Sequence, residues 1–224
     1  MRPNSPRSDD LTPPTAREQA AATRRRRTEE RIVAAATELF LREGYAATSI
    51  AAVAEAAGVS ERTVYVRFAS KVVLFQRVIE VGIVGDVDAT PMPQREWSVD
   101  ALTAATTSAR IAAFADGVSA MHERLGPLMA VNGEVEGSEP SVQDSAGRWR
   151  AATRDYLALF WTTMRTDGLL PASVDLPWLI DTTTVLTAAE SRLLITRTMG
   201  WRRAVYQQWV VTSMTRAAQA AADA

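Results

Sequence analysis

Hydrophobic side chains in the first third of the chain recur at the spacing of amphipathic helices. Within residues 27–43 they fall at i, i+3, i+4, i+7 and i+8 and form one apolar stripe: Ile32, Ala35, Ala36, Leu39 and Phe40. Gly44 follows at the position of a C-terminal cap. We expect a first ordered helix over about 27–43. Thr15, Thr23 and Thr28 are rival starting points, because Thr15 and Glu18 also fit a capping box.

Three shorter helical segments follow, each introduced by a hydroxyl side chain that can cap a helix. Thr48 or Ser49 precedes the segment 50–57, Ser60 precedes a helix that runs to about residue 68, and Ser70 precedes the segment 71–84. A tight turn at Gly58 and Val59 joins the segment 50–57 to the helix that follows Ser60. This is the layout of a helix-turn-helix, whose second helix can lie in the DNA major groove.

The chain beyond residue 84 begins with a break and then returns to helical periodicity. Glycine and proline residues within 85–98 indicate a linker. Further helices are predicted near 99–105, 108–124, 127–136, 141–167, 176–199 and 201–221. The predicted fold class is all-α, with a disordered basic arm (1–26), a helix-turn-helix domain (27–84) and a second helical domain (85–224).

Composition removes several classes of function. The chain has no cysteine and one histidine, so we expect no metal site, no cofactor and no nucleophile–base pair of an enzyme. It has no long uninterrupted apolar run, so we expect no membrane span. The first ten residues show no apolar region of a signal peptide, and the cytoplasm is the expected compartment.

Charge is distributed unevenly although the net charge is only −1. Residues 1–85 carry a net charge of +3 and residues 86–224 a net charge of −4. The N-terminal part is therefore the candidate nucleic-acid end. The arginine run Arg24 to Arg27 is either a solvated face or a basic arm near the DNA backbone or minor groove.

The predicted second helix of the helix-turn-helix has the side chains that DNA recognition needs. Val64 and Phe68 are one turn apart and face the core, while the remaining positions point outward. Arginine can pair with guanine, and threonine or valine can contact a thymine methyl group. Tyr65 and Lys71 suit phosphate contacts, as do free N–H groups near Thr48 and Ser49, although Tyr65 could simply pack against the first helix. The candidate DNA-binding residues are Thr48, Ser49, Ser60, Glu61, Arg62, Thr63, Tyr65, Val66, Arg67 and Lys71.

The segment from about Thr28 to Val78 resembles the TetR family of bacterial transcriptional repressors. The matching landmarks are Ala35-Ala36, Leu39-Phe40, Gly44-Tyr45, Thr48, Ile50, Ala54, Ala57 to Ser60, Thr63, Tyr65, Phe68, Lys71 and Leu74. Arg67 stands where the family often has histidine, and Val72-Val73 where it often has acidic residues. The first departure puts a base or phosphate contact in doubt. Residues 125–128 and 199–209 resemble one subgroup of TetR-like proteins less strongly.

The resemblance implies that the rest of the chain is a helical-bundle domain for ligand binding and dimerisation. An inducer pocket would lie within helices 108–167, closed by the helix near 176. Its candidate residues are aromatic residues and methionines, which also build ordinary cores. The candidate pocket residues are Phe114, Met121, Trp149, Tyr156, Phe160, Met164 and Trp178. Candidate polar groups are His122, Glu123, Arg124 and Glu190, with His122 expected on a partly exposed helix face.

Helices 176–199 and 201–221 are the expected homodimer pair, because two helices from each subunit make a four-helix bundle. Their apolar faces could instead fill an intramolecular core. The sequence thus predicts a sequence-specific regulator that binds a double-stranded DNA operator, with a repressor released by a small-molecule inducer of unknown identity as the favoured form. The alternative is a TetR-like regulator that works without a ligand, through protein partners or as an activator.

Overall fold

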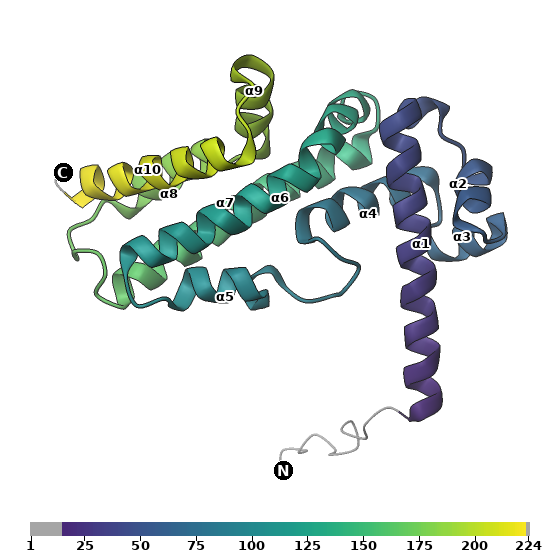
Figure 1. Ribbon diagram of the computed structural model, residues 1–224, viewed down its shortest axis with the longest axis horizontal. Coiled ribbons are helices and arrows are strands. Elements are labelled where there is room, and N and C mark those ends of the chain that lie inside the picture. Colours follow the sequence, from purple (N-terminus) through teal and green to yellow (C-terminus); the bar gives the residue numbers. More distant parts are fainter. Residues whose placement is uncertain (1–14, 223–224) are drawn as a thin grey trace, which may run out of the picture.

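The computed structural model describes residues 15–222, and every regular element within this range is a helix. The predicted all-α class is therefore confirmed. The elements are α1 (Ala16–Ala47), α2 (Ile50–Ala57), α3 (Glu61–Arg67), α4 (Lys71–Val84), the 3₁₀ turn η1 (Met92–Gln94), α5 (Glu96–Thr103), α6 (Thr107–Glu136), α7 (Pro140–Thr166), α8 (Leu176–Leu186), α9 (Ala189–Met199) and α10 (Arg203–Ala222). Helices α1–α4 lie at one end of the molecule, and α5–α10 form the larger body (Figure 1).

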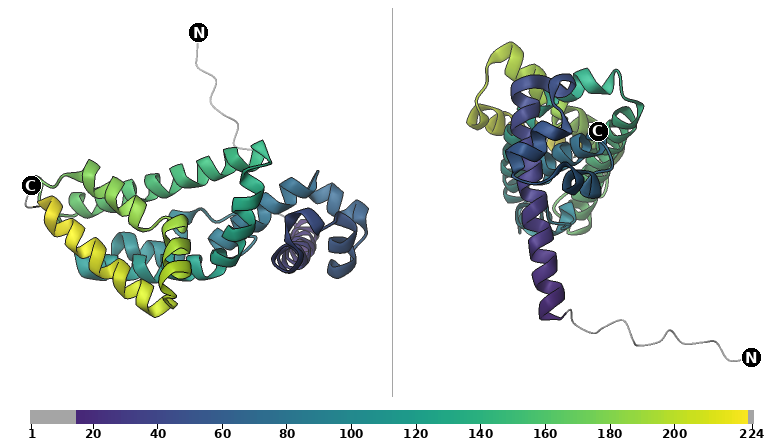
Figure 2. Two further views of the ribbon diagram at one scale, coloured as in Figure 1. Left: turned by 90° about the horizontal axis from the view of Figure 1, so that it is seen from above. Right: turned by 90° about the vertical axis from the view of Figure 1, so that its right-hand side faces the viewer.

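Helix α1 begins much earlier than expected. The Thr15 hydroxyl oxygen accepts a hydrogen bond from the Glu18 backbone N–H, and the Glu18 carboxylate accepts one from the Thr15 backbone N–H. This capping box satisfies two of the helix's free N–H groups. The predicted disordered arm is thus wrong for residues 16–26, and its first 14 residues lie outside the described range. The N-terminal half of α1 projects away from the rest of the protein (Figure 1, Figure 2).

The local cap predictions for the next three helices are confirmed. The hydroxyls of Ser49, Ser60 and Ser70 each accept a hydrogen bond from the backbone N–H three residues later. At the end of α1, Gly44 leaves the helical conformation with a φ of 78°. Such a φ suits glycine, because it has no Cβ atom to clash with the backbone.

One hydrophobic core joins α1–α4 to the larger body. It contains Phe40, Val64 and Phe75 from the N-terminal helices, and Leu125, Leu128 and Val131 from the C-terminal half of α6. The predicted domain boundary near residue 85 therefore does not separate two independent hydrophobic cores, because the first core includes residues from both sides of it. A second core lies against the N-terminal half of α6 and is filled by side chains from α7, α8 and α10, including Trp161, Leu179 and Tyr206.

Three predicted helix boundaries in the C-terminal part were wrong. Helix α6 continues through Gly126 and Pro127, where a break was expected, because long-range packing on both sides holds the helix together. The expected helix 176–199 is divided into α8 and α9 by Ala188, whose backbone is extended. Helix α5 begins at Glu96, inside the expected linker.

Candidate functional site

The turn between α2 and α3 is fixed by Gly58 and by an arginine from α1. Gly58 has a φ of 62°, and its N–H donates to the Glu55 carbonyl oxygen at 3.0 Å. The Arg31 guanidinium donates to the carbonyl oxygens of Ala57 and Gly58, the latter at 2.9 Å. A positive charge suits these carbonyls at the C-terminus of α2. Sequence reasoning missed Arg31, because nothing in local periodicity indicates a contact 26 residues away.

Helix α3 is held from its inner side and leaves its other side open. Val64 is fully buried and Phe68 is 5% exposed, whereas Tyr65 is 51% and Val66 is 75% exposed. Glu61 and Arg62 are exposed as well, and Thr63 and Arg67 are half-buried. The predicted inward and outward faces of this helix are both present.

Helix α3 also has a well-formed start. The Ser60 Oγ lies 2.9 Å from the Thr63 Oγ1 and accepts the Thr63 backbone N–H. At the start of α2, Ser49 is exposed and caps the helix, but Thr48 is 1% exposed and donates its hydroxyl to the Gly44 carbonyl oxygen. Ser49, and not Thr48, is thus the cap that can present a hydroxyl to a phosphate.

Lys71 has protein partners that the sequence did not indicate. Its ammonium group donates to the carbonyl oxygens of Tyr45 and Thr48 at 3.0 and 3.1 Å, and it lies near that of Ala46. The nitrogen is also 4.4 Å from the centre of the Tyr45 ring. Lys71 thereby joins the start of α4 to the end of α1, beside α2. Its positive charge therefore lies near the start of α2, where a phosphate contact was expected. Its three ammonium protons are directed at backbone carbonyl oxygens.

The projecting part of α1 carries an exposed cluster of positive charge. Arg17, Arg24, Arg25 and Arg27 are all exposed. Arg26 differs, because it forms an ion pair of 3.2 Å with Asp88. The exposed arginines extend the positive end of the molecule beyond the helix-turn-helix.

A cavity of about 770 Å³ lies in the larger body, beside α4, α6 and α7. Four of the seven predicted pocket residues line it: Phe114, Met121, Trp149 and Tyr156. The other three do not. Phe160 and Met164 are fully buried in the second core, and Trp178 is 45% exposed at the surface. Their spacing was helical, but periodicity alone does not tell a core face from a cavity face.

Several lining residues come from segments that sequence reasoning left out. Ile79 and Ile83 of α4 reach the cavity, and Trp97 comes from the expected linker. Trp97 packs against Gly117, where a Cβ atom would lie 2.2 Å from the indole ring. A glycine inside a helix can mark such a close approach, and this is the signal that could have located Trp97.

His122 lines the cavity and is 2% exposed, so its expected position on a partly exposed face was wrong. Its Nδ1 lies 3.1 Å from the Tyr206 hydroxyl oxygen. Burial, assisted by the charge of Arg192, lowers the pKa of His122 to about 3. Burial also raises the pKa of Tyr206 above its ordinary value. Both groups are therefore neutral near pH 7.

The other predicted polar groups divide between the cavity and the surface. Glu190 lines the cavity and accepts a hydrogen bond of 2.7 Å from Arg150, which also binds Glu136. Glu123 instead pairs with Arg203 on the outside. Within the described residues, no group of three histidine, cysteine, aspartate or glutamate side chains is placed to hold a metal ion. No described helix has the length and apolar character that crossing a membrane requires.

Residues 32–78 match the family model of bacterial regulatory proteins, tetR family. The matched segment contains the helix-turn-helix and most of α4. This segment therefore belongs to the tetR family of bacterial regulatory proteins. No curated protein sequence matches the chain significantly.

The fold of the whole chain is similar to that of solved regulators. A TetR-family regulator from Mesorhizobium loti is 18% identical, with a TM-score of 0.67 over 87% of this chain and 96% of that chain. One from Rhodococcus sp. is 14% identical, with a TM-score of 0.66 over 86% and 98%. The regulator FadR from Bacillus subtilis, solved in complex with stearoyl-CoA, is 16% identical, with a TM-score of 0.59 over 82% and 96%. At these identities the similarity shows the fold.

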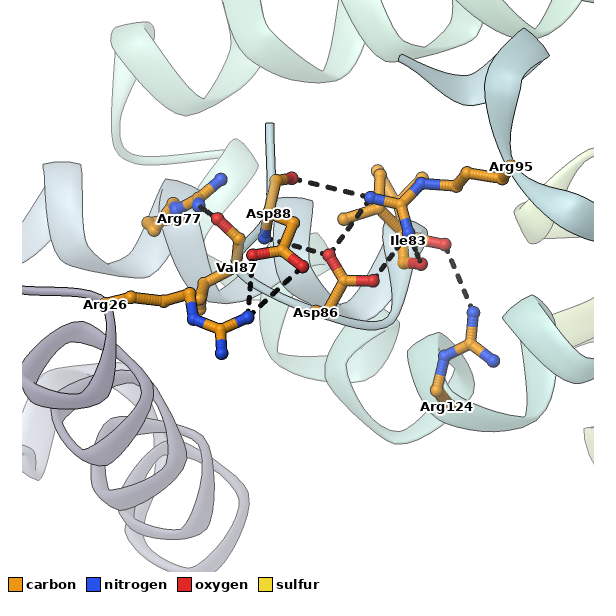
Figure 3. A network of polar contacts seen from close by, with 9 residues as sticks. Arg26, Arg77, Ile83, Asp86, Val87, Asp88, Arg95 and Arg124 are labelled. Carbon is orange, nitrogen blue, oxygen red and sulfur yellow. Dashed lines mark hydrogen bonds and ion pairs between the residues drawn. The ribbon is translucent and has the colours of Figure 1, made fainter. Parts of the chain in front are cut away.

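A polar network surrounds the segment where α4 leaves the helix-turn-helix end of the molecule. Figure 3 shows arginines from four places in the chain converging on residues 83–88. Arg95 donates to the Val84 carbonyl oxygen at 3.0 Å and to Asp86 at 2.6 Å, and the bond to Asp86 holds the pKa of that carboxyl below its ordinary value. Further contacts include Arg26 to Asp88, Arg77 to the Val87 carbonyl oxygen, and Arg124 to the Ile83 carbonyl oxygen. The end of α4 is therefore tied to α1, α5 and α6 together.

Proposed function

We propose that this protein is a sequence-specific regulator of transcription that binds a double-stranded DNA operator and is released from it by a small-molecule inducer. The observation that carries the DNA-binding part is the open face of α3, where Tyr65 and Val66 are exposed beside Arg62 while Val64 fixes the helix from behind. A helix held this rigidly can present its side chains to base edges in a major groove. Action on DNA implies a cytoplasmic location.

The proposed base contacts are made by α3, and the phosphate contacts by its surroundings. Arg62 and Thr63 read bases, with Glu61, Val66 and Arg67 beside them. Tyr65 donates its hydroxyl to a phosphate, and the N-terminal ends of α2 and α3 at Ser49 and Ser60 offer free N–H groups. Lys71 adds positive charge at the same edge, while its hydrogen bonds position α1 against α4.

Inducer binding is supported by the cavity and by its contact with α4. Ile79 and Ile83 line the cavity on the helix that also belongs to the DNA-binding end. A ligand that pushes on these two side chains favours one position of α4, and the network around Asp86 links that position to α1 and α6. The similar fold of FadR from Bacillus subtilis, which holds stearoyl-CoA, also favours a ligand-gated mechanism.

Homodimerisation is supported by exposed apolar side chains on the last three helices. Val185 of α8 is 67% exposed, Leu194 of α9 is 65% exposed, and Val205 of α10 is 51% exposed. Leu179 and Met214, on the same helices, are instead buried within the chain. The proposed interface therefore uses only part of the expected helix faces. A two-fold dimer would present two copies of α3 to two half-sites.

A binding assay with the DNA upstream of the gene tests this function. Fluorescence anisotropy should show saturable binding that weakens steeply with salt. Tyr65→Ala should weaken binding, because Tyr65 is exposed and its removal leaves the core intact. A Val99→Ala variant, changed at an exposed apolar site on α5 outside α1–α4 and the proposed dimer helices, is the control and should bind normally. Equal binding by wild type and Tyr65→Ala would refute the assignment of this face. DNA binding that no ligand alters would favour the ligand-independent alternative.

A further inference from the structure

The cavity is long and follows one helix. Its lining on α6 extends from Phe114 to Asn132, and 18 residues of α-helix span about 27 Å. Between Phe114 and Asn132, most of the α6 side chains that line the cavity are apolar, including Val118, Leu125 and Met129. The occupant that fills such a space is an extended molecule with a largely hydrocarbon body.

The cavity offers no free positive charge to an anionic ligand. Among its lining residues, Arg150 is the only arginine or lysine. Its guanidinium already binds Glu136 at 2.9 and 3.1 Å and Glu190 at 2.7 Å. His122 is held neutral by burial, since its pKa is lowered to about 3. Asp155 also lines the cavity, so a carboxylate would meet negative charge without a free cation to offset it.

One buried polar group in the lining lacks a partner. Asn132 is 1% exposed, and its Oδ1 has no hydrogen bond, whereas its Nδ2 donates weakly to Glu136 at 3.4 Å. An unpaired buried amide oxygen is unfavourable, so a ligand that donates a hydrogen bond to it gains affinity. A hydroxyl group meets this need, because it donates and accepts.

A second polar group lies further along the same helix. This group is the His122 imidazole. Its Nδ1 contacts the Tyr206 hydroxyl, whereas its Nε2 forms no hydrogen bond within the described residues. His122 and Asn132 are ten residues apart on α6, which corresponds to about 15 Å along the axis. A ligand anchored at Asn132 must therefore run along the helix to reach His122.

We propose that the cavity binds an uncharged, chain-like hydrocarbon bearing a hydroxyl group, which hydrogen-bonds to Asn132, and that it discriminates against carboxylates of the same chain. This inference rests on the proposed ligand-gated function and deepens it. It also separates this chain from the stearoyl-CoA complex of Bacillus subtilis FadR, whose ligand carries a large anionic group. The preference for an alcohol over a carboxylate arises because Arg150 is already ion-paired and Asn132 is unpaired.

Titration calorimetry with the full chain tests the ligand class. The probes are 1-dodecanol, dodecanoate and stearoyl-CoA at pH 7.5. Dodecanol should bind at least tenfold more tightly than dodecanoate, because only the alcohol is neutral and can donate to Asn132. Tighter binding of dodecanoate or stearoyl-CoA would overturn the proposal, and so would binding of none of the three.

Two variants test the role of Asn132. Asn132→Leu keeps the volume and removes the amide, so it should weaken dodecanol binding at least fivefold and bring the alcohol and the acid closer together. Ser119→Ala is the control, because Ser119 is also a buried, unpartnered polar residue of α6 but does not line the cavity. Unchanged dodecanol affinity in Asn132→Leu would overturn the assignment of the hydroxyl site. If Asn132→Leu does not fold, the alcohol-to-acid ratio of the wild type decides alone.

The DNA assay separates this inference from the proposed function. If dodecanol binds selectively but leaves the DNA complex unchanged, the ligand class stands and the release mechanism fails. If dodecanoate binds more tightly and releases the DNA, the release mechanism stands and the ligand class fails.

Discussion

The Lys71 ammonium nitrogen lies 3.0 Å from the Tyr45 carbonyl oxygen and 4.4 Å from the centre of the Tyr45 ring. Lysine at the start of α4 thus stabilises the end of α1, where helix carbonyls have no partners of their own. The same group was expected to bind phosphate. The two functions can be separated, because only one of them contributes to stability in the absence of DNA.

Lys71→Ala should lower the free energy of unfolding by about 1–3 kcal/mol, since it removes charged hydrogen bonds to the end of α1. Tyr65→Phe should change stability by less than about 0.5 kcal/mol, because the Tyr65 side chain is largely in solvent. Both should weaken DNA binding. Urea denaturation and DNA anisotropy on the same preparations measure the two effects. A Lys71→Ala protein as stable as the wild type would contradict the structural role of this lysine.

Arg62→Ala should reduce affinity for the operator by about 1–3 kcal/mol and leave binding to unrelated DNA nearly unchanged. The expected loss is specific because Arg62 is exposed on α3, where it is proposed to read a base. Competition between operator and scrambled duplexes measures the ratio. An equal loss on both duplexes would indicate that Arg62 contacts phosphate instead.

The exposed arginines of α1 should contribute to the salt dependence of binding. Replacing Arg24, Arg25 and Arg27 with glutamine should reduce the slope of log affinity against log salt by about 0.9 for each phosphate that is no longer neutralised. Arg165→Gln is the control, since it removes an exposed arginine from α7, outside the helix-turn-helix and the proposed dimer helices. An unchanged slope in the triple variant would leave the cluster as a solvated face.

Leu194→Glu should convert the proposed dimer to a monomer, because it places a charge on the exposed apolar surface of α9. Leu41→Glu is the matched control. Leu41 is 44% exposed on α1, outside the proposed interface, so this variant should stay dimeric. Sedimentation velocity gives the mass of each species. A wild-type protein that sediments as a monomer at micromolar concentration would refute the proposed dimer.

Features set by nearby residues were predictable from the sequence. The caps at Ser49, Ser60 and Ser70 each depend on a contact three residues away, and their helices begin where expected. The anchored and open faces of α3 followed from the spacing of Val64 and Phe68. A prediction of the DNA-binding end needs little more than this local information.

Features set by distant packing were not predictable. Pro127 does not break α6, because Leu125 and Leu128 on either side of it are buried in the first core. Helical spacing selected Phe160 and Trp178 as pocket residues, but one is in the core and the other in solvent. Such assignments depend on which helix packs against each face, and the sequence of a single helix does not contain that information.

His122 should make the stability of the protein depend on pH in a predictable direction. Burial lowers its folded-state pKa to about 3, whereas the unfolded value is close to 6.5. Between these values the unfolded chain binds a proton that the folded chain does not, so stability is fully present above pH 6.5 and is lost as the pH falls. At pH 5 the loss should be about 2 kcal/mol.

His122→Gln should remove this contribution, so that the variant and the wild type differ in slope between pH 7 and pH 5. The comparison is direct because His122 is the only histidine of the chain. Tyr206→Phe is the control: it removes the 3.1 Å contact with Nδ1 but keeps the imidazole buried, so the slope should remain. Urea denaturation at half-unit pH steps provides the measurement. Equal slopes for the wild type and His122→Gln would mean that folding does not lower the pKa of His122, and the neutral cavity wall inferred from its burial would lose its support.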